Sequence, residues 1–217
     1  MAYLIRLYHT SSWTQRAENI SNVLDIDANS IGDLAVRGHT ISTWFVDNGN
    51  TEDIDKAVVA LASCFKTMDP INVVLIDANV LDKNGFLVKK TTAKSTKIRD
   101  FADLHRDIQV YTTREIINLT QIVLKEINQN NVKFYNIEQI IVIMLRLINQ
   151  GILDFNELEY GYKKGMIEKV KKMLKGGRIN EDQINDKIRM YIENNCENSQ
   201  LNNRNLYVKP KQKQSCV

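Results

Sequence analysis

The stretch that decides the predicted fold is Thr112-Thr113-Arg114-Glu115. They form a capping box, in which the Thr112 hydroxyl can accept from the backbone N–H of Glu115 while the Glu115 carboxylate reaches back to the N–H of Thr112. Before this point the sequence consists of short β-branched runs and turn signals, and after it about eighty residues follow a helical pattern. We therefore expect an α+β protein whose sheet precedes its helices.

The second half is expected to be a four-helix bundle over residues 112–195. Residues 137–148 are apolar nearly all round, so this helix must be buried. Two connectors, 147–154 and 173–180, share a glycine stop, an aliphatic residue and an Asx N-cap. Two copies are too few for a solenoid. The expected helices cover 113–129, 137–149, 155–175 and 181–194, and the helix-turn-helix of DNA-binding proteins is the alternative arrangement.

The first half, residues 1–111, is expected to be a small α/β module. Alternating or continuous apolar residues predict strands, and apolar stripes predict helices. If the second helix is the crossover between the last two strands, the sheet of three to five strands is partly parallel. The expected strands are Tyr3–Tyr8, Thr40–Val46 and Ile71–Asp77, and the expected helices are Ser12–Leu24 and Thr51–Lys66 with Thr51 as N-cap. Residues 89–97, which are rich in lysine and threonine, are expected to form an exposed loop.

Composition bounds the class of protein. The chain of 217 residues is 43% hydrophobic and 25% charged, which excludes wholesale disorder. Its three cysteines are widely spaced and have no metal-ligand pattern, so we expect a reduced, cytoplasmic protein without a metal site. No apolar stretch approaches the ~20 residues that span a bilayer, so no membrane contact is expected. Heavy use of isoleucine and asparagine is typical of an AT-rich bacterial or phage genome. Residues 196–217 are polar and basic, which predicts a flexible tail.

Positive charge is concentrated in the second half. Residues 1–110 carry 12 Lys/Arg against 14 Asp/Glu, whereas residues 111–217 carry 17 against 12. The surplus gathers on the Lys163–Arg178 face of one expected helix, opposite an apolar stripe. A solvated surface is the default interpretation of this lysine face, and contact with phosphate or an acidic protein is the alternative. Its candidate binding residues are Lys164, Lys169, Lys171, Lys172, Lys175 and Arg178.

The densest group of catalytic residue types is Asp103-Leu104-His105-Arg106-Asp107. It contains the His-Arg-Asp of a protein-kinase catalytic loop, but Thr112 stands where that family has its metal-binding asparagine, and no glycine-rich nucleotide loop is present. An amphipathic turn with Phe101, Leu104 and Ile108 inward is the alternative interpretation. His105 and Asp107 are nevertheless the first candidates for acid–base chemistry.

His9 is the third candidate, in Tyr8-His9-Thr10-Ser11 at the end of the first expected strand. This placement resembles ADP-ribosyltransferase-like folds, whose first strand carries a His or Arg that polarises a ribose. The resemblance implies a later glutamate on a strand, and Glu157-Leu158-Glu159 is the one Glu-x-Glu pair in the sequence, on an expected helix. Asp47 and Asp77 also follow expected strands, where α/β folds place ligand carboxylates.

No common nucleotide, hydrolase or zinc-protease motif occurs in the sequence. The leading hypothesis is therefore an intracellular interaction or regulatory protein that binds another macromolecule, with a protein as the expected partner, through its helical half. The alternative is a small enzyme that acts on a nucleotide or dinucleotide with His9, His105 and Asp107. The third hypothesis is nucleic-acid binding by the lysine face. The sequence assigns no cofactor and leaves both enzymatic activity and homo-oligomerisation open.

Overall fold

The computed structural model describes residues 2–14, 26–34, 38–47 and 49–193. These residues form a six-stranded sheet in which every neighbouring pair runs antiparallel, in the order β4-β5-β2-β1-β3-β6. The expected mixture of helices and strands is confirmed. The strands are β1 (Tyr3–Leu7), β2 (Thr40–Val46), β3 (Ile71–Asp77), β4 (Val88–Lys90), β5 (His105–Gln109) and β6 (Val132–Tyr135).

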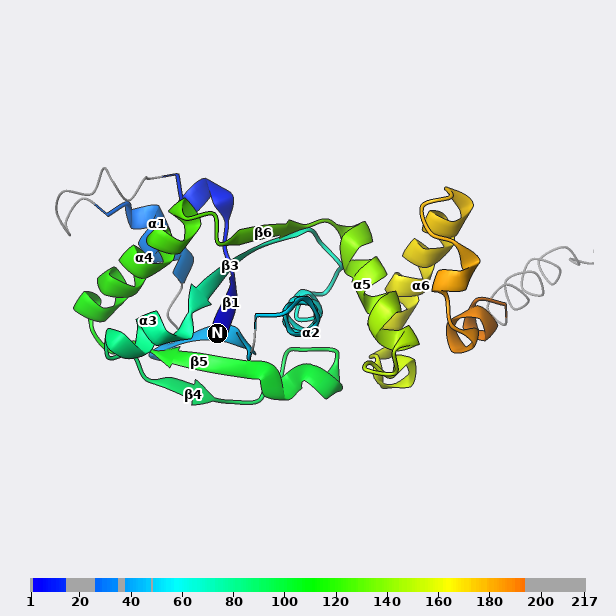
Figure 1. Cartoon of the computed structure of the whole chain (residues 1–217), viewed down its shortest axis with the longest axis horizontal. Helices are drawn as coiled ribbons and strands as arrows, with labels where there is room; N and C mark the ends of the chain where they lie inside the picture. Colours follow the sequence, from blue (N-terminus) through cyan, green and yellow to red (C-terminus); the bar gives the residue numbers. More distant parts are fainter. Residues whose placement is uncertain (1, 15–25, 35–37, 48, 194–217) are drawn as a thin grey trace, which may run out of the picture.

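Helices cover both faces of the sheet (Figure 1). On one face lie α1 (Ala28–Leu34), α3 (Ala78–Lys83) and α4 (Thr113–Asn128), and on the other lies α2 (Thr51–Ala62). Helix α5 (Ile137–Asn149) packs on α2, and α6 (Tyr160–Lys175) packs on α5, so these two extend away from the sheet. Short 3-10 helices are η1 (Thr10–Ser12), η4 (Arg99–Leu104), η5 (Phe155–Glu157) and η6 (Glu181–Gln183), and α-helical residues 186–193 follow η6.

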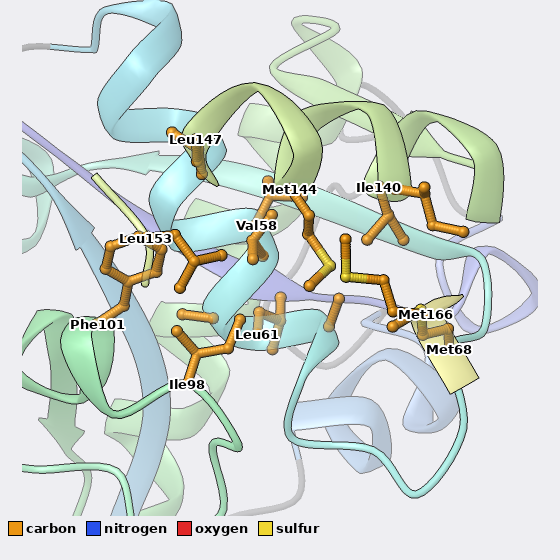
Figure 2. Packing of buried hydrophobic residues seen from close by; sticks show 14 of the residues in the cluster. Val58, Leu61, Met68, Ile98, Phe101, Ile140, Met144, Leu147, Leu153 and Met166 are labelled. Atoms are coloured by element: carbon orange, nitrogen blue, oxygen red, sulfur yellow. The ribbon is translucent and has the colours of Figure 1, made fainter. Parts of the chain in front are cut away.

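The larger hydrophobic cluster continues from the sheet through α2 into the C-terminal helices (Figure 2). It joins Val58 of α2, Met144 of α5 and Met166 of α6, all of which are fully buried. Burying such a side chain contributes about 1.5–3 kcal/mol. The helices after β6 are therefore held by the same core that covers one face of the sheet.

Local sequence signals place several elements correctly. Strands β2 and β3 have the expected bounds, and β2 is central, between β1 and β5. At the start of α4, Thr112 Oγ1 accepts from the Glu115 N–H at 3.2 Å, and at the start of α5, Asn136 Oδ1 accepts from the Gln139 N–H at 2.8 Å. Because a cap satisfies backbone groups within four residues, the sequence alone determines where these helices begin.

The two matched connectors are also confirmed. Gly151 has φ +71° and Gly177 has φ +64°, the left-handed conformation that ends a helix. The next residue then donates back to the preceding turn, with Ile152 N to Leu147 O and the equivalent bond in the second connector both 2.9 Å long. The same sequence pattern thus produces the same backbone geometry twice.

The prediction that the sheet is partly parallel is wrong. Strands β2 and β3 are connected by α2, as expected, but β1 lies between them and pairs antiparallel with both. The first strand therefore occupies the place that a direct parallel pairing would need. This arrangement depends on contacts between distant residues, which the strand pattern does not encode.

The expected four-helix bundle is not confirmed. Strand β6, which the sequence analysis missed, lies between α4 and α5 and pairs with β3. It carries the chain across the edge of the sheet, so α4 packs on one face and α5 on the other. The division of the chain at residues 111 and 112 stays a prediction, and the sheet takes strands from both sides of it.

Smaller differences concern ends of elements. The N-cap of α2 is Asn50, whose side chain accepts from the Asp53 N–H, and the helix ends at Ala62 rather than near Lys66. Helix α3 was not expected, and β4 includes part of the expected loop at 89–97. The expected helix at 12–24 falls mostly outside the described residues, and so does the tail at 196–217. In the described ranges, no helix has both the length and the apolar character needed to cross a bilayer.

Candidate active site

A cavity of ≈ 290 Å³ opens between the sheet and the C-terminal end of α2. Strands β1, β2 and β5 contribute to its lining, together with α1, the end of α2, and the segments that follow β1, α2 and β4. Two of the three expected catalytic residues, His9 and His105, line it. The other lining residues are Arg6, Leu7, Asp33, Ser42, Trp44, Leu61, Cys64 and Ser95.

His9 is held by a buried carboxylate. Its ring Nδ1 contacts Asp33 Oδ1 closely, and the other carboxylate oxygen accepts from the His9 N–H at 3.0 Å and from Trp13 Nε1 at 2.6 Å. The Asp33 side chain is 5% exposed, whereas the His9 side chain is 68% exposed. A carboxylate on Nδ1 fixes the ring and leaves Nε2 to take up or release a proton.

Arg6 supplies a buried positive charge beside this pair. Its guanidinium donates to the backbone oxygens of Asp33 and Leu34, both at 2.9 Å, and to Ser42 O at 3.1 Å. These bonds tie β1 to α1 and β2 and so fix the position of Asp33. Burial lowers the pKa of Arg6, and the negative charge of Asp33 opposes this shift.

His105 approaches the cavity from β5, on the same face of the sheet as Trp44. The two rings meet edge to face, with centroids 5.3 Å apart, and His105 Nδ1 lies 2.7 Å from Thr91 Oγ1. Burial lowers the pKa of His105, opposed by Asp107, while Arg106 lowers it further. The ring is therefore neutral at pH 7, and it can exchange hydrogen bonds with a ligand without carrying charge.

Asp107, the third expected catalytic residue, is not among the residues that line the cavity. Its Oδ1 is 4.0 Å from His105 Nε2 and accepts from Ser42 Oγ at 3.4 Å. The expectation that residues 103–107 form an amphipathic turn is wrong, because η4 ends at Leu104 and His105 begins a strand. Phe101 and Ile108 are buried as expected.

Cys64 also lines the cavity, and its thiol is a potential nucleophile. Burial raises the pKa of its thiol, and a hydrogen bond with Ser95 and the charge of Lys97 oppose this shift only in part. The group is therefore a protonated thiol at neutral pH, which is a poor nucleophile. Among the described residues, no group of three or more His, Cys, Asp or Glu side chains is placed to hold a metal ion.

A second cavity, of ≈ 320 Å³, adjoins the first and shares Leu7 and His9 with it. It lies at the C-terminal end of β1 and the start of β3, and Tyr8 and Phe65 are among its lining residues. The exposed edge of His9 therefore stands between two hollows. A ligand that occupied both would pass this ring.

The two glutamates considered for the ADP-ribosyltransferase resemblance, Glu157 and Glu159, lie outside the cavity. Glu157 ends η5 and Glu159 is the N-cap residue of α6, so neither is on a strand, and neither lines the cavity. The resemblance therefore ends at the first strand.

The lysine face lies far along the chain, on α6. Tyr162, Met166, Ile167, Val170 and Met173 form its buried side, and Lys164, Lys169, Lys172 and Lys175 are exposed, so the helix is two-sided as expected. Lys171 lies 4.0 Å from Glu168, and Arg178 pairs with Glu138. Binding of phosphate or protein by this face stays a prediction.

Sequence reasoning missed the residues that surround the histidines. Arg6 gave one signal, because it interrupts an apolar strand, and a charged residue in that position needs a partner. Asp33 gave no such signal, because its contact with His9 joins residues that are 24 positions apart in the sequence. No family model, curated protein or solved structure matches the chain.

Proposed function

We propose that the protein is an enzyme that acts on a nucleotide or dinucleotide by proton transfer at His9. One observation carries the proposal: two histidines far apart in the sequence line one cavity, and one of them is held by a buried carboxylate. Carboxylate-oriented histidines serve as general bases because one nitrogen is fixed and the other faces the substrate.

The two histidines have different roles in this proposal. His9 takes a proton from a water molecule or a substrate hydroxyl group through Nε2, and the Asp33 carboxylate stabilises the positive ring that results. His105 stays neutral, since burial lowers its pKa, and holds the substrate by a hydrogen bond. Asp107 acts through His105 and Ser42 as a positioning residue.

The shape and lining of the two cavities support the substrate class. Each has about the volume of a small-ligand site, and their lining includes the aromatic residue Phe65 and polar groups near His9. A nucleotide combines a planar ring with a polar sugar and phosphate. Arg6 lines the same cavity as His9 and His105, and its positive charge would stabilise a bound phosphate group.

The test is turnover by the full chain of a panel of mono- and dinucleotides, followed by chromatography and mass spectrometry. We expect at least one substrate to be converted, and we expect His9→Gln to lower kcat by about 100-fold or more. His39→Gln is the matched control, because His39 packs on Tyr111 and does not line the cavity. Full activity in His9→Gln, or no turnover of any nucleotide by the natural chain, would refute the proposal.

A second candidate function is binding of a protein partner through the helical half. It is favoured by a hollow of ≈ 410 Å³ between α2, α5 and the end of α6, where Val142 and Ile143 are only half-buried. The test is pull-down from the native host with the natural chain and with Ile143→Glu. A partner that both forms capture equally would exclude this surface.

A further inference from the structure

A third cavity, of ≈ 420 Å³, lies on the opposite face of the sheet from α2. It is bounded by the start of β1, the end of β3, α3 and the C-terminal turns of α4. Asp77, one of the two strand-end aspartates considered from the sequence, lines it. None of the residues proposed for catalysis does.

The main feature of this cavity is a buried carboxylate that is not paired with any cation of the described part of the chain. Glu126 is 5% exposed, and its Oε2 accepts from Asn131 Nδ2 at 2.5 Å. Among the described residues, no cation lies within ion-pair distance of it. Among the described residues, none donates a hydrogen bond to its Oε1, and this oxygen is not fully enclosed, so it is available to a ligand in the cavity that Glu126 lines. A buried charge is costly unless a partner neutralises it.

Three of the other polar side chains that line the cavity can act as acceptors. Asn84 Nδ2 donates to Val80 O at 2.8 Å and Asn131 Nδ2 donates to Glu126, and each amide also has a carbonyl oxygen that can accept from a ligand. Asp77 uses Oδ1 to cap α3 through the Asn79 N–H, which leaves Oδ2. A ligand that satisfies these groups must donate several hydrogen bonds.

The local electrostatics favour a cation. The cavity adjoins the C-terminal end of α4, a helix of 16 residues whose dipole places partial negative charge there. Two carboxylates, Asp77 and Glu126, face one lysine, Lys125, which is exposed at the rim. The net charge of the lining residues is thus negative.

We propose that this cavity binds a small organic cation, an alkyl ammonium or a guanidinium, with Glu126 as its counter-ion. The ammonium or guanidinium group supplies both the positive charge that Glu126 lacks and the N–H donors that the amide oxygens can accept. This site is separate from the proposed catalytic site and does not depend on it.

The experiment is isothermal titration of the full chain with agmatine and with putrescine, and with 1,4-butanediol as an uncharged analogue of putrescine. We expect saturable binding of at least one cation and none of the diol. Glu126→Gln, which can still accept from Asn131, is expected to bind about tenfold more weakly or worse. Lys125→Ala is the matched control on the same helix, and it is expected to bind as well as the natural chain or more tightly.

Binding of neither cation to the natural chain would overturn the proposal, and so would equal binding by Glu126→Gln or by the diol. If Glu126→Gln does not fold, Asn84→Leu replaces it, because it removes one acceptor and leaves Glu126 in place. That variant is expected to bind about two- to tenfold more weakly. Unchanged affinity in Asn84→Leu would likewise count against the site.

Discussion

Replacing Asp33 by asparagine tests how His9 is held. In the natural chain, Asp33 Oδ2 accepts from the His9 N–H at 3.0 Å and from Trp13 Nε1 at 2.6 Å. Asparagine offers a neutral oxygen in place of the charged one, and a hydrogen bond to a charged group is worth about 1 kcal/mol more than one between neutral groups. Since the bond from the His9 N–H is exposed to solvent, we expect a total loss of about 1–2 kcal/mol.

Urea unfolding followed by circular dichroism measures this loss. With a slope of about 2 kcal/mol per molar urea, the midpoint of Asp33→Asn is expected to fall by about 0.5–1 M. Asp33→Ala is expected to fall further, because it leaves the buried Trp13 N–H without an acceptor. If both variants unfold at the midpoint of the natural chain, Asp33 does not make the contacts on which the site depends.

The same substitution is expected to change the tautomer of His9. Asp33 requires the proton on Nδ1, whereas an asparagine amide can donate to Nδ1 and so moves the proton to Nε2. Long-range proton–nitrogen spectra at pH 8 distinguish the two forms. An Nε2–H tautomer already present in the natural chain would refute the proposed role of Asp33.

Three further predictions concern stability. Burial lowers the pKa of His105, so the unfolded chain takes up a proton near pH 6.5 and the folded chain only at lower pH. Unfolding measured at pH 7.5 and at pH 5.5 should therefore show a loss of stability in acid, and this loss should be smaller in His105→Gln. An equal loss in both forms would contradict the lowered pKa. Arg146 of α5 pairs with Asp55 of α2, which is 4% exposed. Because the Arg146 side chain is 44% exposed, we expect Arg146→Ala to cost about 2–3 kcal/mol in urea unfolding, part of it regained when Asp55→Ala is added. A neutral single variant would show that the pair does not hold α5 to α2. Neither Gly151 nor Gly165 has an atom within 4 Å of an added methyl group, so the backbone conformation decides the effect of alanine at each. Gly151→Ala should destabilise the protein by about 1 kcal/mol because Gly151 has a positive φ, whereas Gly165→Ala within α6 should stabilise it by about 0.5–1 kcal/mol. The reverse order of melting temperatures would contradict this prediction.

The parts of the fold that the sequence predicts are those set by neighbouring residues. The capping boxes at Thr112 and Asn136 and the glycine stop at Gly151 act within one helical turn, so α4 and α5 are found at their expected places. The order of strands depends on contacts between residues such as Leu4 and Ile76, far apart in the chain. That is why β1 between β2 and β3 was not foreseen.

Strand β6 shows why the helical half was misread. Val132-Lys133-Phe134-Tyr135 is only four residues long, and Phe134 is exposed, so the segment lacks the alternation of a longer half-buried strand. Without it, α4 and α5 look like consecutive helices of one bundle. With it, the chain crosses the edge of the sheet between them.

In the candidate site, as in the fold, the sequence indicates local features but not contacts between distant residues. His9 and His105 were singled out by residue type and by position near predicted strand ends, and the structure places both at one cavity. Their partners Asp33 and Thr91, and the bond from Arg6 to Asp33, could not be assigned, because each contact joins residues 14 or more positions apart. Residue types suggest chemistry, and only the fold brings them together.

The most direct test of the proposed function uses the three histidines, His9, His39 and His105, as nuclear magnetic resonance probes. Each gives one ring signal, which single substitutions assign, and the full chain is titrated with AMP, ADP-ribose and NAD⁺. We predict that at least one of these ligands moves the signals of His9 and His105 with a single dissociation constant and leaves that of His39 in place. If none moves His9, or if His9 and His105 respond with different dissociation constants, the two histidines do not serve one nucleotide site.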